Sequence, residues 1–291
     1  MRRKTEVLLA VTLVATFAVA QSGEDLKIFI SVDMEGITGV VNWEDVSRDG
    51  KDYDYFRQIM TREVNAAIEG AVASGATDIV VRDSHGSARN LLPELLDRNA
   101  RLLRDWSGGP KGMMDGLDES FDAVIFVGYH AKAGTPNALL EHTMSSSNVL
   151  DVSINGVSLP EAGINALIAG YYDVPVVFVA GERALCEQAT TLLGSVETVA
   201  VKEGVGNGAL CLHPEVSRQQ ISDGVGKALR RLEDYRPFTM NSPYTLTIKF
   251  KNEEKVHAGS FYPGAQRTGD WELTFESGDL MEIIRAINWL I

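Results

Sequence analysis

The chain has 291 residues, of which 45% are hydrophobic and 23% are charged, and its formal net charge at pH 7 is −13. This composition is ordinary for a globular protein and supplies enough apolar side chains for one large α/β domain, alone or with a small second portion. The strong negative charge repels nucleic-acid phosphates and anionic lipids, which argues against nucleic acid and membrane surfaces as partners.

The first twenty residues differ in composition from the rest of the chain. Basic residues at positions 2–4 precede an uncharged run from Val7 to Ala20, which is shorter than the roughly 20 apolar residues that a membrane-spanning helix needs. This run ends Ala-Val-Ala before Gln21. A basic head, an apolar middle and a small-x-small exit are typical of a secretory signal peptide. We therefore predict a signal peptide at residues 1–20 and a secreted or periplasmic mature protein with no membrane partner; an uncleaved N-terminal anchor is the alternative.

An alternation of strands and helices is predicted from residue 27 onward. Four short runs rich in Val, Ile and Phe are typical of buried strands, and they span residues 27–33, 78–84, 122–129 and 174–180. Apolar residues at helical spacing predict a helix over 55–74, between the first two strands, and another that begins near Glu161 and ends at Gly170. This order predicts an α/β fold with a largely parallel sheet covered by helices on both faces.

The pattern loosens in the second half of the chain. Asn155-Gly156 is a hairpin turn signal and predicts a small antiparallel excursion just before the Glu161 helix. After about residue 200, the expected elements are two strands of a mixed sheet and a closing helix, at 245–250, 271–275 and 278–290. We therefore predict a larger α/β domain over residues 21–200 and a smaller C-terminal α+β portion over 201–291.

Neither the cysteines nor the glycine-rich segment matches a known type of site. Cys186 and Cys211 could form one disulfide in an oxidising compartment or remain buried free thiols, but neither belongs to a Cys-x-x-Cys pair. The run from Glu203 to Gly208 is similar to a phosphate-binding loop, yet it lacks the Gly-Lys-Ser/Thr ending and the Rossmann spacing. We predict a flexible connection there.

Acidic and imidazole side chains follow three of the predicted strands. Asp33 and Glu35 are two residues apart at the end of the first strand, so both carboxylates project from one face and repel unless a cation or proton lies between them. The next two strands end at Asp83 and His85, and at His130. Ligands of open α/β sheets bind beyond the carboxyl ends of the strands, so we expect these side chains to meet at one edge. Taken singly, each could equally be a helix cap or an exposed loop histidine.

Six motifs in order along the chain resemble one peptidase family. They are SVDMEG, RDSHG, FVGYHAKAGTP, LEHTM, INGVSLPEAGINA and AGYYDVPVVFVAG. Together they are similar to the zinc D-aminopeptidases of the DppA type, the M55 peptidase family, and the similarity covers residues 27–290, thinning after residue 200. The resemblance implies a ring-like homo-oligomer whose sites face an inner cavity.

The resemblance also implies a ligand set for two zinc ions. The family binds them through an Asp-x-Glu pair, two histidines and a later glutamate. The matching residues are Asp33, which would bridge both ions, and Glu35, His85, His130 and Glu161. Three carboxylates against two Zn²⁺ leave one positive charge, which a bridging hydroxide would neutralise, and coordination lowers the pKa of bound water to about 7. Residues 21–200 would thus form the metal-binding catalytic domain.

Further roles are expected for residues around this set. His142, in LEHTM, matches the family's catalytic histidine, and the resemblance assigns it to proton transfer or to stabilisation of the tetrahedral intermediate. A surface loop histidine is the alternative. We predict that Asp83 and Glu182 do not bind metal themselves but orient the residues that do. His213 and His257 lie outside the motifs and are expected to be structural or solvent-facing.

The function that these residues favour is a dinuclear zinc aminopeptidase. It would use a metal-activated hydroxide to hydrolyse N-terminal amino acids, by resemblance D-amino acids, from short peptides or amides. One alternative is another dinuclear metal amide or ester hydrolase, because the ligands encode water activation and not the shape of the pocket. The other is an exported peptide- or metal-binding protein without catalysis, which would not need a reserved histidine beside two metals. Turnover of a chromogenic D-alanine amide separates these classes.

Overall fold

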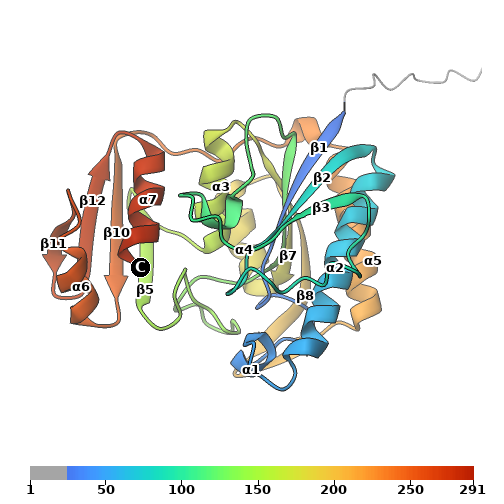
Figure 1. Cartoon of the computed structure of the whole chain (residues 1–291), viewed down its shortest axis with the longest axis horizontal. Helices are drawn as coiled ribbons and strands as arrows, with labels where there is room; N and C mark the ends of the chain where they lie inside the picture. The colour runs from blue at the N-terminus through green and yellow to red at the C-terminus, as the bar shows by residue number, and fades with distance from the viewer. Residues whose placement is uncertain (1–24) are drawn as a thin grey trace, which may run out of the picture.

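The computed structural model describes residues 25–291, so the predicted signal peptide lies outside the described residues. A seven-stranded sheet with the order β3-β2-β1-β4-β7-β8-β9 forms its larger part (Figure 1). The strands are β1 (Leu26–Val32), β2 (Ala76–Asp83), β3 (Ala100–Leu103), β4 (Ala123–Tyr129), β7 (Val176–Glu182), β8 (Glu197–Val205) and β9 (Gly208–Cys211). All neighbours pair in parallel except β9, which is antiparallel to β8. The largely parallel sheet is confirmed.

Helices cover both faces of this sheet, as predicted. They are α2 (Tyr53–Ala73) and α5 (Pro214–Leu229) on one face, and α3 (Glu161–Tyr171) and α4 (Arg183–Leu193) on the other (Figure 1). The central strands β4 and β7 are buried at every residue, because apolar side chains point into a core on each side. Within residues 25–291, no helix combines the length and the hydrophobicity needed to span a bilayer.

A second, five-stranded sheet has the order β11-β12-β10-β5-β6. Its strands are β5 (Val149–Ile154), β6 (Val157–Ser158), β10 (Tyr244–Phe250), β11 (Gln266–Gly269) and β12 (Glu272–Ser277), and α6 (Glu253–Gly259) and α7 (Leu280–Leu290) pack against it. The hairpin predicted at Asn155-Gly156 joins β5 to β6, with positive φ at both turn residues. Every pairing is antiparallel, so the expectation of a mixed sheet is wrong.

The chain does not pass from the large sheet to the small sheet at residue 200, the predicted boundary between the two portions. That position lies inside β8 of the large sheet, whereas β5 and β6 come earlier in the chain and belong to the small sheet. Pairing of β5 with β10, about a hundred residues later, creates this arrangement, and local sequence patterns do not encode it. The run from Glu203 to Gly208 is also no flexible connection, because it forms the β8–β9 hairpin. The short elements α1 (Trp43–Val46), η1 (Gly112–Met114) and η2 (Leu232–Asp234) complete the fold.

The two cysteines are free thiols. Cys186 is buried in α4, whereas Cys211 is exposed on β9. The disulfide alternative is therefore not formed, and the expectation that both thiols are buried holds for Cys186 alone.

Candidate metal centre

Close packing of two strand ends fixes the position of Asp33 and Glu35. The Asp33 N–H donates to the Val127 carbonyl at 2.9 Å, and the Gly36 N–H donates to the Gly128 carbonyl at 2.7 Å. A Cβ at Gly36 would lie 1.8 Å from the Tyr129 carbonyl oxygen, and a Cβ at Gly128 would lie 2.2 Å from the backbone carbonyl oxygen of Asp33. Only glycine permits this approach. The chain leaving β1 therefore crosses the end of β4, which brings the carboxylates beside His130.

The structure brings together the six residues predicted to bind metal or to act in catalysis. His130 Nε2 lies 3.4 Å from Asp33 Oδ2 and 3.6 Å from Glu161 Oε1. His85 Nδ1 lies 3.2 Å from Asp33 Oδ1 and 2.9 Å from Glu35 Oε2. His142 Nε2 lies 3.5 Å from Glu161 Oε1. Their backbones come from β1, β2, β4 and their loops, and from the first residue of α3.

Each of the three imidazoles contacts a backbone carbonyl with one nitrogen and the carboxylates with the other. His130 Nδ1 lies 2.9 Å from the Ala131 oxygen, His85 Nε2 lies 3.0 Å from the Val46 oxygen, and His142 Nδ1 lies 2.8 Å from the Leu140 oxygen. A carbonyl oxygen only accepts, so these nitrogens carry the hydrogen. The second nitrogen of each ring then faces a carboxylate, which is favourable when a proton or a metal cation lies between them.

Two groups of side chains have the spacing to hold a metal ion. One is Asp33, Glu35 and His130, and the other is His130, His142 and Glu161; within each group the ligand atoms lie within 4.8 Å of one another. His130 belongs to both, and its buried Nε2 has no hydrogen-bond partner among residues 25–291. His142, which was predicted to be catalytic, thus also stands within reach of a metal. His85 belongs to neither group, although it contacts two of the carboxylates.

The pKa shifts in this cluster reflect an excess of buried carboxylates. Burial raises the pKa of Asp33 to about 7, and the neighbouring Glu35 adds to the rise. Burial alone would lower the pKa of His130, but Glu161 and Asp33 outweigh it and raise the value to about 10. The carboxylates likewise raise the pKa of His85 against the effect of burial. The cluster therefore attracts positive charge, which fits a cation-binding site.

His142 differs from the other two histidines in its surroundings. Its ring stacks on His130, with centroids 4.0 Å apart and an interplanar angle of 13°, and the Trp43 ring lies 5.5 Å away at an angle of 59°. Burial lowers the pKa of His142, and the neighbouring His130 lowers it further. The pKa shift favours a neutral ring whose Nε2 is available to exchange a proton.

Asp83 and Glu182 accept hydrogen bonds from backbone groups around the cluster. Asp83 accepts hydrogen bonds from the Asn90 and Leu91 N–H groups at 2.6 and 2.7 Å, and the Asn90 amide in turn donates to the His85 carbonyl at 2.7 Å. Glu182 accepts from the N–H groups of residues 131 and 139 at 2.9 and 2.7 Å, which fixes both ends of the loop between His130 and His142. His213 caps α5 and His257 is exposed on α6, both outside this cluster.

Sequence reasoning missed Lys202, which is buried beneath the centre. Its ammonium donates to the Glu35 carbonyl and, at 2.5 Å, to the Val40 carbonyl, so it fastens the loop that follows β1. Burial lowers the pKa of Lys202 to about 8, although Glu182, its partner in strand register, opposes the shift. The buried Val199 and Val201 place Lys202 on the opposite face of β8, where alternation predicts solvent. No local signal therefore marks this lysine.

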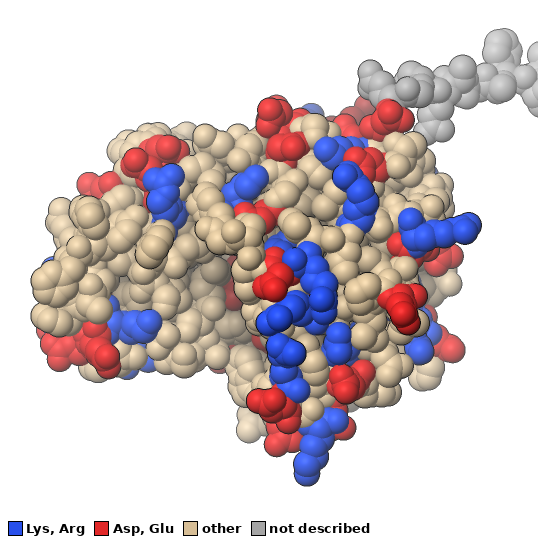
Figure 2. Space-filling model, in the orientation of Figure 1, with Lys and Arg blue, Asp and Glu red and all other residues tan. Residues whose placement is uncertain are grey.

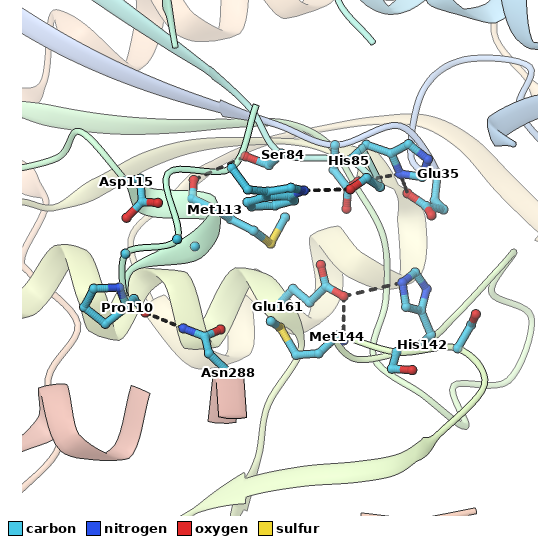
Figure 3. A pocket seen from close by; sticks show the side chains of 18 of the residues that line it. Glu35, Ser84, His85, Pro110, Met113, Asp115, His142, Met144, Glu161 and Asn288 are labelled. Atoms are coloured by element: carbon cyan, nitrogen blue, oxygen red, sulfur yellow. Dashed lines mark hydrogen bonds and ion pairs between the residues drawn. The ribbon is translucent and has the colours of Figure 1, made fainter. Parts of the chain in front are cut away.

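A cavity of about 860 Å³ opens in front of the cluster (Figure 3). Figure 2 shows the hollow between the parts built on the large and the small sheets. Glu35, His85, Glu161 and His142 lie on one side in Figure 3, and Asp115, Pro110 and Asn288 lie on the other. A cavity of this size suits a small ligand. Its far wall comes from the loop at 108–112 and from α7, which the motifs do not mark as part of the site.

Three comparisons place this site among known proteins. The sequence model of the M55 peptidase family, described as D-aminopeptidase, matches residues 26–289. A D-aminopeptidase of Bacillus subtilis (strain 168) is 36% identical over 266 residues, which cover 90% of this chain and 95% of the relative. The solved structure of the Zn-dependent D-aminopeptidase DppA from Bacillus subtilis, a self-compartmentalizing protease, superposes with a TM-score of 0.88 at 34% identity and covers 91% of this chain and 96% of that one. The sequence, the fold and the ligand cluster thus agree, and this chain belongs to the M55 peptidase family of D-aminopeptidases.

Proposed function

We propose that this protein is a dinuclear zinc aminopeptidase that removes N-terminal D-amino acids from short peptides or amides. The observation that carries the proposal is the orientation of His85, His130 and His142. In each ring, one nitrogen forms a hydrogen bond to a backbone carbonyl and the other faces a buried carboxylate. The related Bacillus subtilis enzyme is Zn-dependent, and two imidazoles among carboxylates suit zinc.

The residues present fit two zinc ions. Asp33, Glu35, His85, His130 and Glu161 would hold them. The two carboxylate oxygens of Asp33 face different histidines, Oδ1 facing His85 and Oδ2 facing His130. The orphaned Nε2 of His130 would gain its missing partner. Paired zinc ions supply Lewis acidity toward the scissile carbonyl and lower the pKa of bound water toward 7.

The side chains around the metals position the substrate and move its protons. His142 Nε2 faces the pocket while the Leu140 carbonyl fixes its tautomer, so the neutral ring can accept a proton and pass it to the leaving amine. The stacked His130 and the nearby Trp43 restrict the orientation of the ring. Glu182 holds the loop on which both histidines lie.

Substrate chirality and metal dependence test this function together. We expect the zinc-loaded protein to hydrolyse D-alanyl p-nitroanilide faster than the L-alanyl compound, and to lose this activity to a chelator and regain it with zinc. Release of nitroaniline measures both effects. Faster turnover of the L-compound would contradict the D preference. Binding without turnover of either compound would favour a binding protein, and turnover of esters alone would favour another hydrolase.

Lys202→Met tests whether the buried ammonium holds the metal-binding loop in place. The substitution keeps an apolar stem but leaves the carbonyls of Glu35 and Val40 without their donor. We expect zinc affinity to fall about 10- to 100-fold, the usual effect of losing a group that orients ligands. Competition with a zinc chelator measures the affinity. Lys202→Arg should recover part of it, and Lys249→Met, an exposed change on β10, should have no effect; equal affinity in all variants would refute the role.

We also propose that the protein is exported and begins at Gln21 in its mature form. The proposal rests on the basic, apolar and small-residue order of the first twenty residues. Intact-mass measurement of the protein expressed in its native host should give the mass of residues 21–291. A mass that includes residues 1–20 would show that the segment is retained, as an uncleaved anchor would be.

A homo-oligomer is proposed as the working form. The related Bacillus subtilis structure is described as a self-compartmentalizing protease. In this chain, Phe261 and Leu210 expose 76% and 69% of their surface, and neither lines the active-site cavity. Large exposed apolar side chains favour burial between subunits.

A further inference from the structure

Charge is distributed unevenly around the active-site cavity. Asp33, Glu35 and Glu161 belong to the metal centre on one side. Among the described residues that line the cavity, Arg285 is the one lysine or arginine, and it comes from α7 on the other side. It forms no ion pair within residues 25–291. The cavity thus offers an unused cation opposite its metal-binding end.

The other acidic residue of the cavity does not neutralise Arg285. Asp115 is only 6% exposed and accepts a hydrogen bond from the Ser107 hydroxyl at 2.5 Å. Burial lowers the pKa of Arg82, and the negative charge of Asp115 opposes this shift. Asp115 thus has a hydroxyl partner of its own and forms no ion pair with Arg285 among residues 25–291, which leaves Arg285 available to a ligand.

Packing of α7 holds Arg285 at the cavity wall. Arg285, Asn288 and Trp289 have the i, i+3, i+4 spacing of one helix face, and all three line the cavity. Asn288 donates a hydrogen bond to the Pro110 carbonyl, which joins α7 to the loop on the far wall (Figure 3). On its opposite side α7 buries Ile283, Ile284 and Ile287 in the core. Arg285 therefore extends from a fixed helix and not from a loop.

We infer that Arg285 binds the C-terminal carboxylate of short peptide substrates. A peptide whose scissile bond lies at the metal centre directs its carboxyl end away from that centre, across the cavity. A guanidinium presents paired N–H donors that match a carboxylate, and such charge-assisted bonds are about twice as strong as neutral ones. The inference rests on the proposed aminopeptidase function and deepens it: the cavity selects short peptides with a free C-terminus over amidated or longer chains.

The test compares a free acid with its amide. We expect the wild-type enzyme to cleave D-alanyl-D-alanine with a kcat/KM about 10- to 100-fold above that for D-alanyl-D-alaninamide, the usual worth of a hydrogen bond to a charged group. Arg285→Gln should bring this ratio close to one, mainly through a higher KM for the acid. Arg285→Lys should keep part of the preference. Arg98→Gln is a matched control, because Arg98 is exposed, lies outside the cavity and carries the same charge.

A binding measurement separates this inference from the function on which it rests. Calorimetry with the uncleavable reduced-amide analogue of D-alanyl-D-alanine, as acid and as carboxamide, should show the same acid preference in the wild type and its loss in Arg285→Gln. An equal ratio in the wild type and Arg285→Gln, by turnover or by binding, would overturn the role of Arg285. Absence of turnover with the acid preference intact would count against the peptidase function alone.

Discussion

Asp33→Asn is expected to remove metal binding and hydrolysis together. Its two carboxylate oxygens face His85 and His130, the positions from which one group can hold two cations. Asparagine keeps the shape but has no negative charge and only one acceptor oxygen. We expect the metal content to fall well below two equivalents per chain and kcat to fall at least about 10³-fold. Metal Lewis acidity stabilises the transition state by several kcal/mol, and each loss of about 1.4 kcal/mol lowers the rate tenfold.

The fold should survive this substitution. The remaining amide oxygen can still accept the hydrogen bond that Asp33 Oδ1 receives from the Met34 N–H at 2.8 Å. Glu63→Gln is the matched control. Glu63 is also a buried carboxyl, whose pKa burial raises to about 7, but it belongs to neither group of side chains that could hold a metal ion. Elemental analysis and turnover of both variants give the result. Full metal content in Asp33→Asn, or equal loss in Glu63→Gln, would contradict the assignment.

The edge of the sheet at which the site forms follows from the sequence alone. Val32 of β1 is level with Asp83 of β2 and with Val127 of β4, so three parallel strands end side by side. The residues just beyond these ends, among them Asp33, His85 and His130, must therefore meet. Parallel pairing is predictable here because each strand is a short apolar run separated by helical or connecting segments.

Other parts of the site depend on contacts between distant segments. Glu161 reaches the cluster because the β5–β6 hairpin pairs with β10 and returns the chain to the start of α3. Periodicity in the sequence carries no information about that partner, and the ligand role of Glu161 rests on family resemblance. The same holds for Lys202, whose burial follows from packing under the Glu35 loop, and for Arg285, which reaches the cavity through the docking of α7.

His142→Ala is expected to lower turnover while leaving both zinc ions bound. The side chain lies within metal distance together with His130 and Glu161, so geometry alone permits a ligand role as well as a proton-transfer role. Five other ligands already serve two ions on the proposed assignment, which leaves His142 free for the reaction. We expect kcat to fall about 10²- to 10⁴-fold, the usual contribution of a positioned acid–base group.

Stability and metal content decide between the two roles of His142. Alanine loses the stacking on His130 and the contact with Trp43, which are worth about 0.5–1.5 kcal/mol each at most, so the unfolding midpoint should fall by several degrees while the fold stays intact. His257→Ala, an exposed histidine of α6, is the matched control for loss of an imidazole. If His142→Ala loses zinc as Asp33→Asn does, His142 is a ligand; if it keeps wild-type kcat, the ring takes no part in proton transfer. Retained zinc with a large loss of kcat leaves proton exchange at Nε2 as the role that fits both its neutral state and its place in the pocket.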